Sequence, residues 1–347
     1  MTPSDLDAAL AALPKAELHL HLEGSMAPET VVRLAARYGV AVEAAEVAQR
    51  YCSRDFAGFL DAFRWVTSFL RAPEDYRLVA GELIRRLSEQ NVVYAEITLS
   101  AGVMLRRGQD VAENLGAVRD AARQASARGL RVQWILDAVR QFGPEAAMEA
   151  ARWAVRLAGE DVVAFGIGGD ELAIPAREFA PVFDFVRAAG LHALAHAGEI
   201  GGPEIVREAL DRLSPARIGH GLGALHDPGL MDRLAGEGLP LEICPTSNLR
   251  TGALARQLGA GRAGLDRHPL KLFFDRGLRV TLSTDDPAMF ETDLTAEYRA
   301  AAVSMGFAPA ELARLAEMSF ECALLPESDR SAYRQRFRRE ASAAGLL

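Results

Sequence analysis

The sequence contains little cysteine, and the few that it has do not form a recognisable pattern. Its three cysteines, Cys52, Cys244 and Cys322, are far apart and odd in number. They include no Cys-X-X-Cys pair, which is the spacing of structural zinc sites, and they do not suggest a disulfide framework. We therefore expect a protein of a reducing compartment, the cytoplasm.

Basic clusters and long apolar runs are also missing. The 347 residues carry a net charge of −8 and no run of five basic residues, whereas nucleic-acid-binding proteins usually present a basic patch. No apolar stretch approaches the roughly 18 residues that span a bilayer. Met1–Leu13 contains Asp5 and Asp7 and no basic residue, which is not typical of a secretory signal. We expect neither a nucleic-acid nor a membrane partner.

With 347 residues the chain is long enough for one α/β barrel domain, which needs about 250 residues. Half of its residues are hydrophobic, which is enough for a large core. Strand-like and helical segments alternate along it. Strands are expected at about 15–21, 92–98, 131–138, 162–166, 192–196, 217–219, 240–243 and 278–283. Eight βα units predict parallel strands and a single (β/α)8 barrel domain over 1–347, with extra helices after the first strand and from about residue 293. A doubly wound open sheet is the alternative, although no Gly-X-Gly-X-X-Gly follows the first strand.

The long helical insertion after the first strand contains apolar residues at helical spacing. Core packing is the favoured explanation. The alternative is an apolar lid over a planar ligand, because an insertion after a barrel strand lies near the mouth of the barrel. The residues concerned are Phe56, Phe59, Leu60, Phe63, Phe69 and Leu70.

The first expected strand alternates polar and apolar residues. This pattern predicts Glu17, His19 and His21 on one face and the three leucines 18, 20 and 22 on the other. Two imidazoles on a rigid strand are a plausible pair of metal ligands. A His-X-His pair alone is weak evidence, so further ligands have to come from elsewhere in the chain.

Polar clusters follow five other expected strands, at the end where barrel enzymes place catalytic residues. Four histidines and two aspartates converging on one mouth are difficult to explain as packing, because unpaired buried charge is costly. The clusters are Gly168–Glu171, His196–Glu199, Gly219–Gly221, Cys244–Asn248 and Ser283–Pro287.

Three histidines and one carboxylate make a mononuclear zinc site with one position left for water. We assign His19, His21, His196 and Asp285 to one zinc ion, which lowers the pKa of a bound water toward ~7. A second metal in such a barrel usually needs a bridging acid group, often a modified lysine, from the fourth strand, and residues 162–170 contain no lysine.

Three further residues have expected catalytic roles beside the metal. Glu199 is placed to pass a proton as a general acid–base, although a helix N-terminal carboxylate is the structural alternative. His220 can orient or deprotonate the water and stabilise a developing oxyanion. Asp286 can accept a hydrogen bond from the substrate. The remaining histidines, His192, His226 and His268, are expected to be structural or exposed.

These clusters, together with Pro14–Ser25, resemble the signature blocks of the adenosine deaminase family, and the match covers essentially the whole chain in order. The resemblance implies a zinc (β/α)8 barrel that hydrolyses the 6-amino group of a purine to a 6-oxo group and releases ammonia. The combined His-X-Glu and Pro-Cys-X-X-Cys pattern of cytidine-type zinc deaminases is absent.

The resemblance also implies a role for each matching residue. The zinc ligands would be the four assigned above, with His21 also near the substrate. Glu199 would protonate the purine N1, His220 would orient the zinc hydroxide, Asp286 would hydrogen-bond N7 or the attacking oxygen, and the Gly169 backbone would contact N3.

The substrate is less closely specified. After the two histidines, nucleoside deaminases of the family usually carry Asp before Gly, and that carboxylate addresses the ribose; here the residue is Glu23. Adenosine or deoxyadenosine is the leading substrate. Adenine and 6-amino-6-deoxyfutalosine, a purine nucleoside with a large 5′ group, are the alternatives. Adenine deaminases often have Glu at this position but tend to carry Leu in place of Thr246. A zinc ester or amide hydrolase and a non-catalytic binding protein are remote alternatives.

Overall fold

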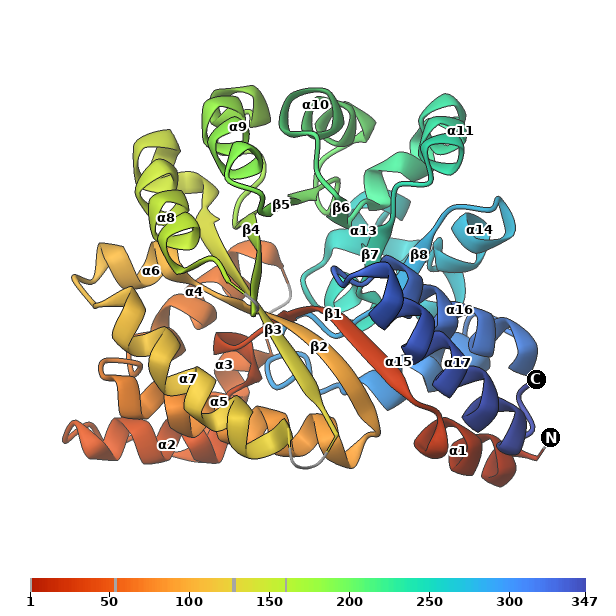
Figure 1. Ribbon diagram of the computed structural model, residues 1–347, viewed down its shortest axis with the longest axis horizontal. Helices are drawn as coiled ribbons and strands as arrows, with labels where there is room; N and C mark the ends of the chain where they lie inside the picture. Colours follow the sequence, from red (N-terminus) through yellow and green to blue (C-terminus); the bar gives the residue numbers. More distant parts are fainter. Residues whose placement is uncertain (1, 53–54, 127–128, 160) are drawn as a thin grey trace.

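A parallel sheet of eight strands in the order β1-β2-β3-β4-β5-β6-β7-β8 is the centre of the molecule (Figure 1). It is seen in a computed structural model, which describes residues 2–52, 55–126, 129–159 and 161–347. Every strand expected from the sequence is present. The strands are β1 Lys15–His21, β2 Val92–Leu99, β3 Arg131–Val139, β4 Val162–Gly168, β5 His192–Ala197, β6 Arg217–His220, β7 Leu241–Ile243 and β8 Val280–Leu282.

The sheet closes into a barrel through the segment that follows β8. The N–H of Asp285 donates to the carbonyl oxygen of His19 at 3.0 Å, and the N–H of His21 donates to the carbonyl oxygen of Asp285 at 2.8 Å. Leu20 and Asp285 therefore form a parallel bridge. A closed circle of parallel strands with helices outside is the (β/α)8 fold predicted above, and it excludes the open doubly wound sheet.

Helices surround the barrel on its outer face (Figure 1). No described helix is long and apolar enough to cross a membrane. The α-helices are α1 Pro3–Ala12, α2 Pro28–Arg37, α3 Ala44–Tyr51, α4 Phe56–Thr67, α5 Pro73–Glu89, α6 Ala101–Arg106, α7 Val111–Ser126, α8 Gly143–Leu157, α9 Ala180–Ala188, α10 Pro203–Leu213, α11 Pro228–Glu237, α12 Pro245–Arg250, α13 Ala253–Leu258, α14 Leu270–Asp275, α15 Leu294–Val303, α16 Pro309–Cys322 and α17 Glu327–Ala343.

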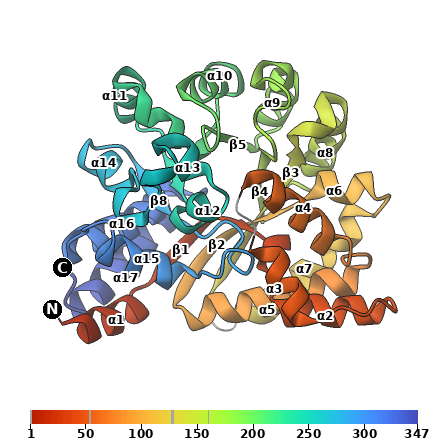
Figure 2. The same ribbon diagram turned by 180° about the vertical axis from the view of Figure 1, so that it is seen from behind.

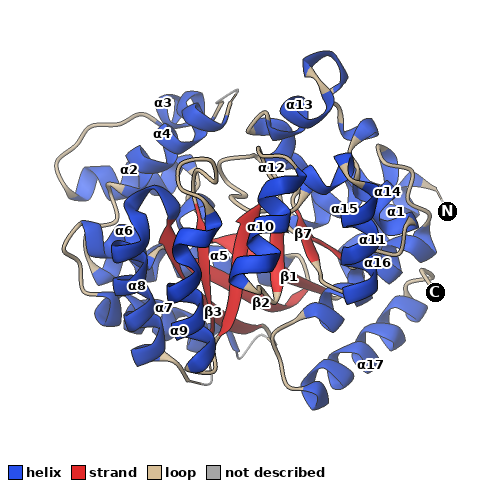
Figure 3. Ribbon diagram, turned by 90° about the horizontal axis from the view of Figure 1, so that it is seen from above, coloured by secondary structure: helices blue, strands red, loops and turns tan. Residues whose placement is uncertain are grey.

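The extra helices lie at the two ends of the barrel. Helices α3 and α4 gather with α12 and α13 at one end, which faces the viewer in Figure 2 and is uppermost in Figure 3. Helix α17 lies at the opposite end (Figure 3), where Arg131 at the start of β3 pairs with Asp329 of α17 at 2.6 Å. The insertion after β1 thus contributes to the mouth, whereas the C-terminal helices pack against the base and side.

One detail of β1 differs from the predicted alternation. The register of β1 against β2 shifts between Glu17 and Leu20, where three steps on β1 oppose two on β2, as in a β-bulge. Glu17 accepts a hydrogen bond from the N–H of Thr284 at 3.0 Å and lies among residues of α5, whereas Leu18 and His19 both line the barrel interior. The prediction that Glu17 shares a face with His19 and His21 was therefore wrong.

A buried ion network supports the barrel interior. The guanidinium of Arg217, only 1% exposed, donates to the carboxylates of Glu96 and Glu242 and, at 3.0 Å, to the carbonyl oxygen of Cys322. Tyr94 donates its hydroxyl proton to Glu96 at 2.7 Å. Charges at this depth are tolerated only when they are paired and hydrogen-bonded, so Arg217 stabilises the fold through both neighbours.

Replacing Arg217 by Met should destabilise the protein strongly, because the variant leaves Glu96 and Glu242 buried without their cation. We expect the free energy of unfolding in urea to fall by about 3–5 kcal/mol. The matched control is Arg233→Met, since Arg233 also joins two carboxylates, Asp211 and Glu237, but at the surface. The control should lose no more than about 1 kcal/mol. Equal losses in the two variants would contradict this role of the network.

Candidate active site

Four imidazoles surround the carboxylate of Asp285 at the mouth of the barrel. The ligand atoms of His19, His196, His220 and Asp285 all lie within 4.8 Å of one another. His21 reaches the same carboxylate, with Nε2 3.3 Å from Oδ1 of Asp285. The structure therefore brings together all four expected metal ligands and His220, and the donor set fits one metal ion.

The backbone holds two of these residues in a conformation that costs free energy. Asp285 has φ +65° and His220 has φ +64°, in the left-handed region that side chains other than glycine rarely adopt. Each such residue costs about 1–3 kcal/mol and persists where its surroundings determine its position. Asp285 is fixed by its two backbone bonds to β1 and by the hydroxyl of Ser247, which donates to Oδ2 at 2.6 Å.

Two histidines direct Nε2 at the centre of the cluster and hold a proton on Nδ1. Nδ1 of His19 donates to Glu242 at 2.9 Å, and its Nε2, which has no hydrogen-bond partner, lies 3.4 Å from Asp285. Nδ1 of His196 donates to the carbonyl oxygen of Ile167 at 3.1 Å. A ring that holds its Nδ1 proton on an acceptor can offer Nε2 to a metal ion, which is the arrangement of metal-binding histidines.

His220 carries its proton on the other ring nitrogen, Nε2, and a chain of hydrogen bonds fixes this tautomer. The N–H of Leu270 donates to Nδ1 of His268 at 3.1 Å, so His268 carries its proton on Nε2 and donates to Oδ1 of Asn248 at 3.2 Å. The Asn248 amide then donates to Nδ1 of His220 at 3.0 Å. Burial lowers the pKa of His220 to about 3, so the ring is neutral and its single proton lies on Nε2.

Glu199 is held beside the cluster by a second carboxylate. Glu171 accepts hydrogen bonds of 2.6 Å from the N–H groups of Gly198, Ile200 and Gly201, which flank Glu199 in the loop after β5. Oε2 of Glu199 lies 3.7 Å from Nε2 of His220. Burial, followed by the nearby Asp285 and Glu171 carboxylates, raises the pKa of Glu199 well above its ordinary value. A carboxyl group in this environment keeps its proton to higher pH than a free one does, which suits a general acid.

Asp286 lies against the backbone of the first βα loop. A Cβ atom on Gly24 would fall 1.6 Å from Oδ1 of Asp286, so only glycine leaves room for this carboxyl group. Oδ1 is buried without a hydrogen-bond partner, and burial followed by the charge of Asp285 raises the pKa of Asp286. Asp286 also lines the cavity at the mouth of the barrel, and a carboxyl group with an unpartnered oxygen is suited to bind a polar group of a ligand there.

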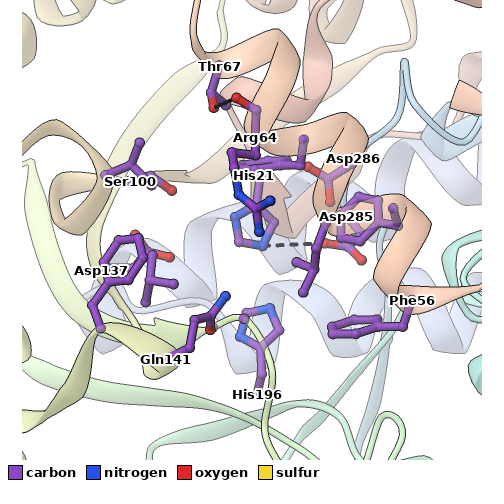
Figure 4. Close-up of a pocket in the computed structure, with 18 of the residues that line it drawn as sticks. His21, Phe56, Arg64, Thr67, Ser100, Asp137, Gln141, His196, Asp285 and Asp286 are labelled. Carbon is purple, nitrogen blue, oxygen red and sulfur yellow. Dashed lines mark hydrogen bonds and ion pairs between the residues drawn. The ribbon is translucent and has the colours of Figure 1, made fainter. Parts of the chain in front are cut away.

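These groups open into a cavity of about 700 Å3 (Figure 4). Four apolar residues of α4 line it, Phe56, Phe59, Leu60 and Phe63, while Phe69 and Leu70 are buried in the core. The apolar segment therefore serves both of the purposes considered above. Its first turns form an apolar wall of the cavity, and its last residues pack into the core.

Gly169 and Glu23, the other two residues expected to contact the substrate, lie in different positions relative to the cavity. Gly169 lines the cavity at φ +88°, where a Cβ atom would approach the amide oxygen of Gln141 to 2.4 Å. Glu23 is 1% exposed and is not among the lining residues described; its Oε1 accepts from the N–H of Ser100 at 2.9 Å, and Oε2 has no partner. Burial raises the pKa of Glu23 to about 7.

Several residues of the site were not identified from the sequence. Ser100 and Asp137, at the ends of β2 and β3, line the cavity, and the rule on strand ends applied to them equally. His268, expected to be structural or exposed, is buried in contact with Asn248. Glu242 lies within β7, and the cavity wall also carries Arg64 of α4, Arg106 of α6 and Arg107 directly after α6, which no sequence pattern identifies.

Comparison with known proteins gives consistent results. The family model described as adenosine deaminase matches residues 14–339. The chain is 42% identical to an aminodeoxyfutalosine deaminase of Streptomyces coelicolor over 93% of this chain and 83% of that one. It is 38% identical to an adenine deaminase of Sinorhizobium medicae over 92% and 97%. The crystal structure of an amidohydrolase from Burkholderia ambifaria with bound Zn, 27% identical, superposes with a TM-score of 0.91 over 99% of this chain and 95% of that one.

Replacing Asn248 by Asp should move the proton of His220. A carboxylate accepts where the amide donated, so His220 would carry its proton on Nδ1 and lose the donor at Nε2. We expect kcat to fall by about 100-fold, the loss that follows removal of one donor to a developing oxyanion. Zinc content, measured by mass spectrometry of the metal, should stay unchanged. A variant with normal kcat would show that the orientation of the His220 protons has no role in turnover.

Proposed function

Because the chain belongs to the adenosine deaminase family, and is thus a zinc-dependent hydrolytic deaminase, we propose that it acts on 6-amino-6-deoxyfutalosine. The reaction replaces the 6-amino group of the purine by a 6-oxo group and releases ammonia. Small purine substrates and water are the reactants of its deaminase relatives.

The size of the cavity is the observation that carries this proposal. A volume of about 700 Å3 lies within the range of about 300–1,000 Å3 for sites that enclose drug-sized ligands. A purine nucleoside with a large 5′ group suits such a cavity, whereas a free base fills little of it. The relative with 42% identity is an aminodeoxyfutalosine deaminase. The expectation that adenosine or deoxyadenosine is the main substrate is less well supported than either alternative.

Adenine is the second candidate substrate. The relative with 38% identity is an adenine deaminase. Glu23 is the residue that adenine deaminases of the family often carry, and its Oε1 accepts a hydrogen bond from the N–H of Ser100 at the cavity wall.

The residues proposed to hold zinc are His19, His21, His196 and Asp285. His19 and His196 hold a proton on Nδ1 and direct Nε2 at the cluster, and His21 lies 3.3 Å from Asp285 through Nε2. His220 is not proposed as a ligand, because its Nε2 carries the proton. Zinc, when bound, acts as a Lewis acid that makes a water molecule more acidic.

The other residues are proposed to move protons and to position the purine. Glu199, a buried carboxyl group whose pKa is raised, donates a proton to N1 and makes C6 more electrophilic. The Nε2–H of His220 donates to the attacking oxygen and stabilises the charge that develops on it. Asp286 hydrogen-bonds the attacking oxygen or N7, and the Gly169 backbone contacts N3. Of the two protons of the water, one ends on N1 and the other on the leaving ammonia.

A substrate panel tests this proposal. We expect kcat/KM of the zinc-loaded protein to be at least tenfold higher for aminodeoxyfutalosine than for adenosine, deoxyadenosine or adenine, measured by the loss of purine absorbance. The Glu199→Gln variant serves as the blank, because it retains the cavity but has no acid proton at this position. A higher kcat/KM for adenine would assign the second candidate, and turnover of none of the four would contradict the assignment to purine deamination.

A further inference from the structure

The wall of the cavity carries positive charge that the reaction does not use. Three arginines line it: Arg64 from α4, Arg106 at the end of α6, and Arg107, the residue that follows α6. The acidic groups lining the same cavity are buried side chains around the metal cluster and β3, namely Asp137, Glu199, Asp285 and Asp286. Within the cavity, basic side chains therefore lie at α4 and α6 and acidic side chains at the metal cluster and β3, although the protein as a whole is acidic.

Arg107 is occupied by the fold. Its guanidinium donates to the carbonyl oxygen and, at 2.9 Å, to the hydroxyl of Thr67, and also to the carbonyl oxygen of Arg64 at 3.3 Å. These bonds tie α6 to the last turn of α4. Arg107 thus positions the two helices that carry the other arginines, and three of its five N–H donors are used in doing so.

Arg64 and Arg106 retain donors for a ligand. Arg106 stacks on Phe142, with 4.6 Å from the guanidinium carbon to the ring centre, and it has no carboxylate partner in the part of the chain that the structure describes. Arg64 pairs with Asp61 at 2.8 Å, but both side chains are more than 70% exposed, and an exposed pair of this kind is weak. Figure 4 shows the guanidinium of Arg64 directed into the pocket.

Aromatic and aliphatic side chains accompany the two guanidinium groups. Phe63, Val103 and Phe142 line the same cavity, from α4, α6 and the segment after β3. Both guanidinium groups are solvent-accessible, and a ligand that packs against these apolar walls would displace water from them and lower the local dielectric constant, which strengthens their attraction for an anion. Its planar array of donors matches the oxygens of a carboxylate or a phosphate.

We propose that Arg64 and Arg106 form a subsite for an anionic group at the outer end of the substrate, on an apolar substituent that follows the aromatic wall. This inference rests on the proposed function and extends it, because it names the residues that distinguish an anionic nucleoside from adenosine or adenine. The anion is a carboxylate or a phosphate. Aminodeoxyfutalosine carries a carboxylate on its 5′ group, and AMP carries a phosphate.

The test compares anionic with neutral substrates in arginine variants. The kcat/KM ratio of aminodeoxyfutalosine to adenosine, and of AMP to adenosine, is measured for the wild type, Arg64→Ala, Arg106→Ala and the double variant. A charge-assisted hydrogen bond is worth about 1.5–3 kcal/mol, so each single change should lower the first ratio at least tenfold, mainly through KM. Lysine at either position should restore part of the loss.

The matched control is Arg85→Ala. Arg85 is a half-exposed arginine of α5 that pairs with Glu89 and does not line the cavity. It should leave both ratios within twofold of the wild type. Raising the salt concentration should lower kcat/KM for the anionic substrate more than for adenosine in the wild type, and this difference should disappear in the double variant.

The outcomes separate the subsite from the proposed function. A ratio that is unchanged in both variants and in the double variant overturns the subsite, even if the wild type prefers aminodeoxyfutalosine. An arginine-dependent preference for AMP over aminodeoxyfutalosine supports the subsite and contradicts the proposed substrate. Equal losses for anionic and neutral substrates would show a general effect of α4 and α6 on the cavity and would also overturn the subsite.

Discussion

The closure of the barrel is the constraint on which the site depends. The backbone of Asp285 bonds on one side to His19 and on the other to His21, at 3.0 and 2.8 Å, and these bonds join β8 to β1. The same residues supply three of the four proposed metal ligands. The geometry of the metal site is therefore set by the hydrogen bonds that complete the fold, and the left-handed backbone of Asp285 is part of that closure.

Hydrogen bonds to neighbouring groups also determine which ring nitrogen of each histidine in the cluster carries a proton. Glu242 and the carbonyl oxygen of Ile167 accept from His19 and His196, which leaves both Nε2 atoms free. Asn248 donates to His220, which leaves its Nε2 protonated. Rings of one residue type in one cluster thus acquire different chemistry from their partners. Arg217 sustains this arrangement from below, because it fixes the carboxylate of Glu242.

The sequence was sufficient for the strand order, the barrel and the residues at its mouth. Buried parallel strands have a strong apolar pattern that the sequence shows directly. The polar clusters that follow these strands all lie at the carboxyl ends of the strands, and in a barrel these ends meet at one face. It was insufficient where a local irregularity or a long-range contact decides the outcome. The bulge in β1 moves Glu17 away from the histidines, and His268 reaches the site only through Asn248. The arginines of the cavity wall depend on how α4 and α6 pack together, which local spacing does not encode.

Zinc affinity in two single variants tests the central claim, that the direction of hydrogen bonding decides which rings bind the metal. His21→Ala and His220→Ala each remove one of the imidazoles near Asp285, and zinc content is measured by mass spectrometry after dialysis against a weak chelator. The account predicts that the His220 variant retains one zinc per chain while the His21 variant loses it. Retention by the His21 variant together with loss by the His220 variant would contradict it.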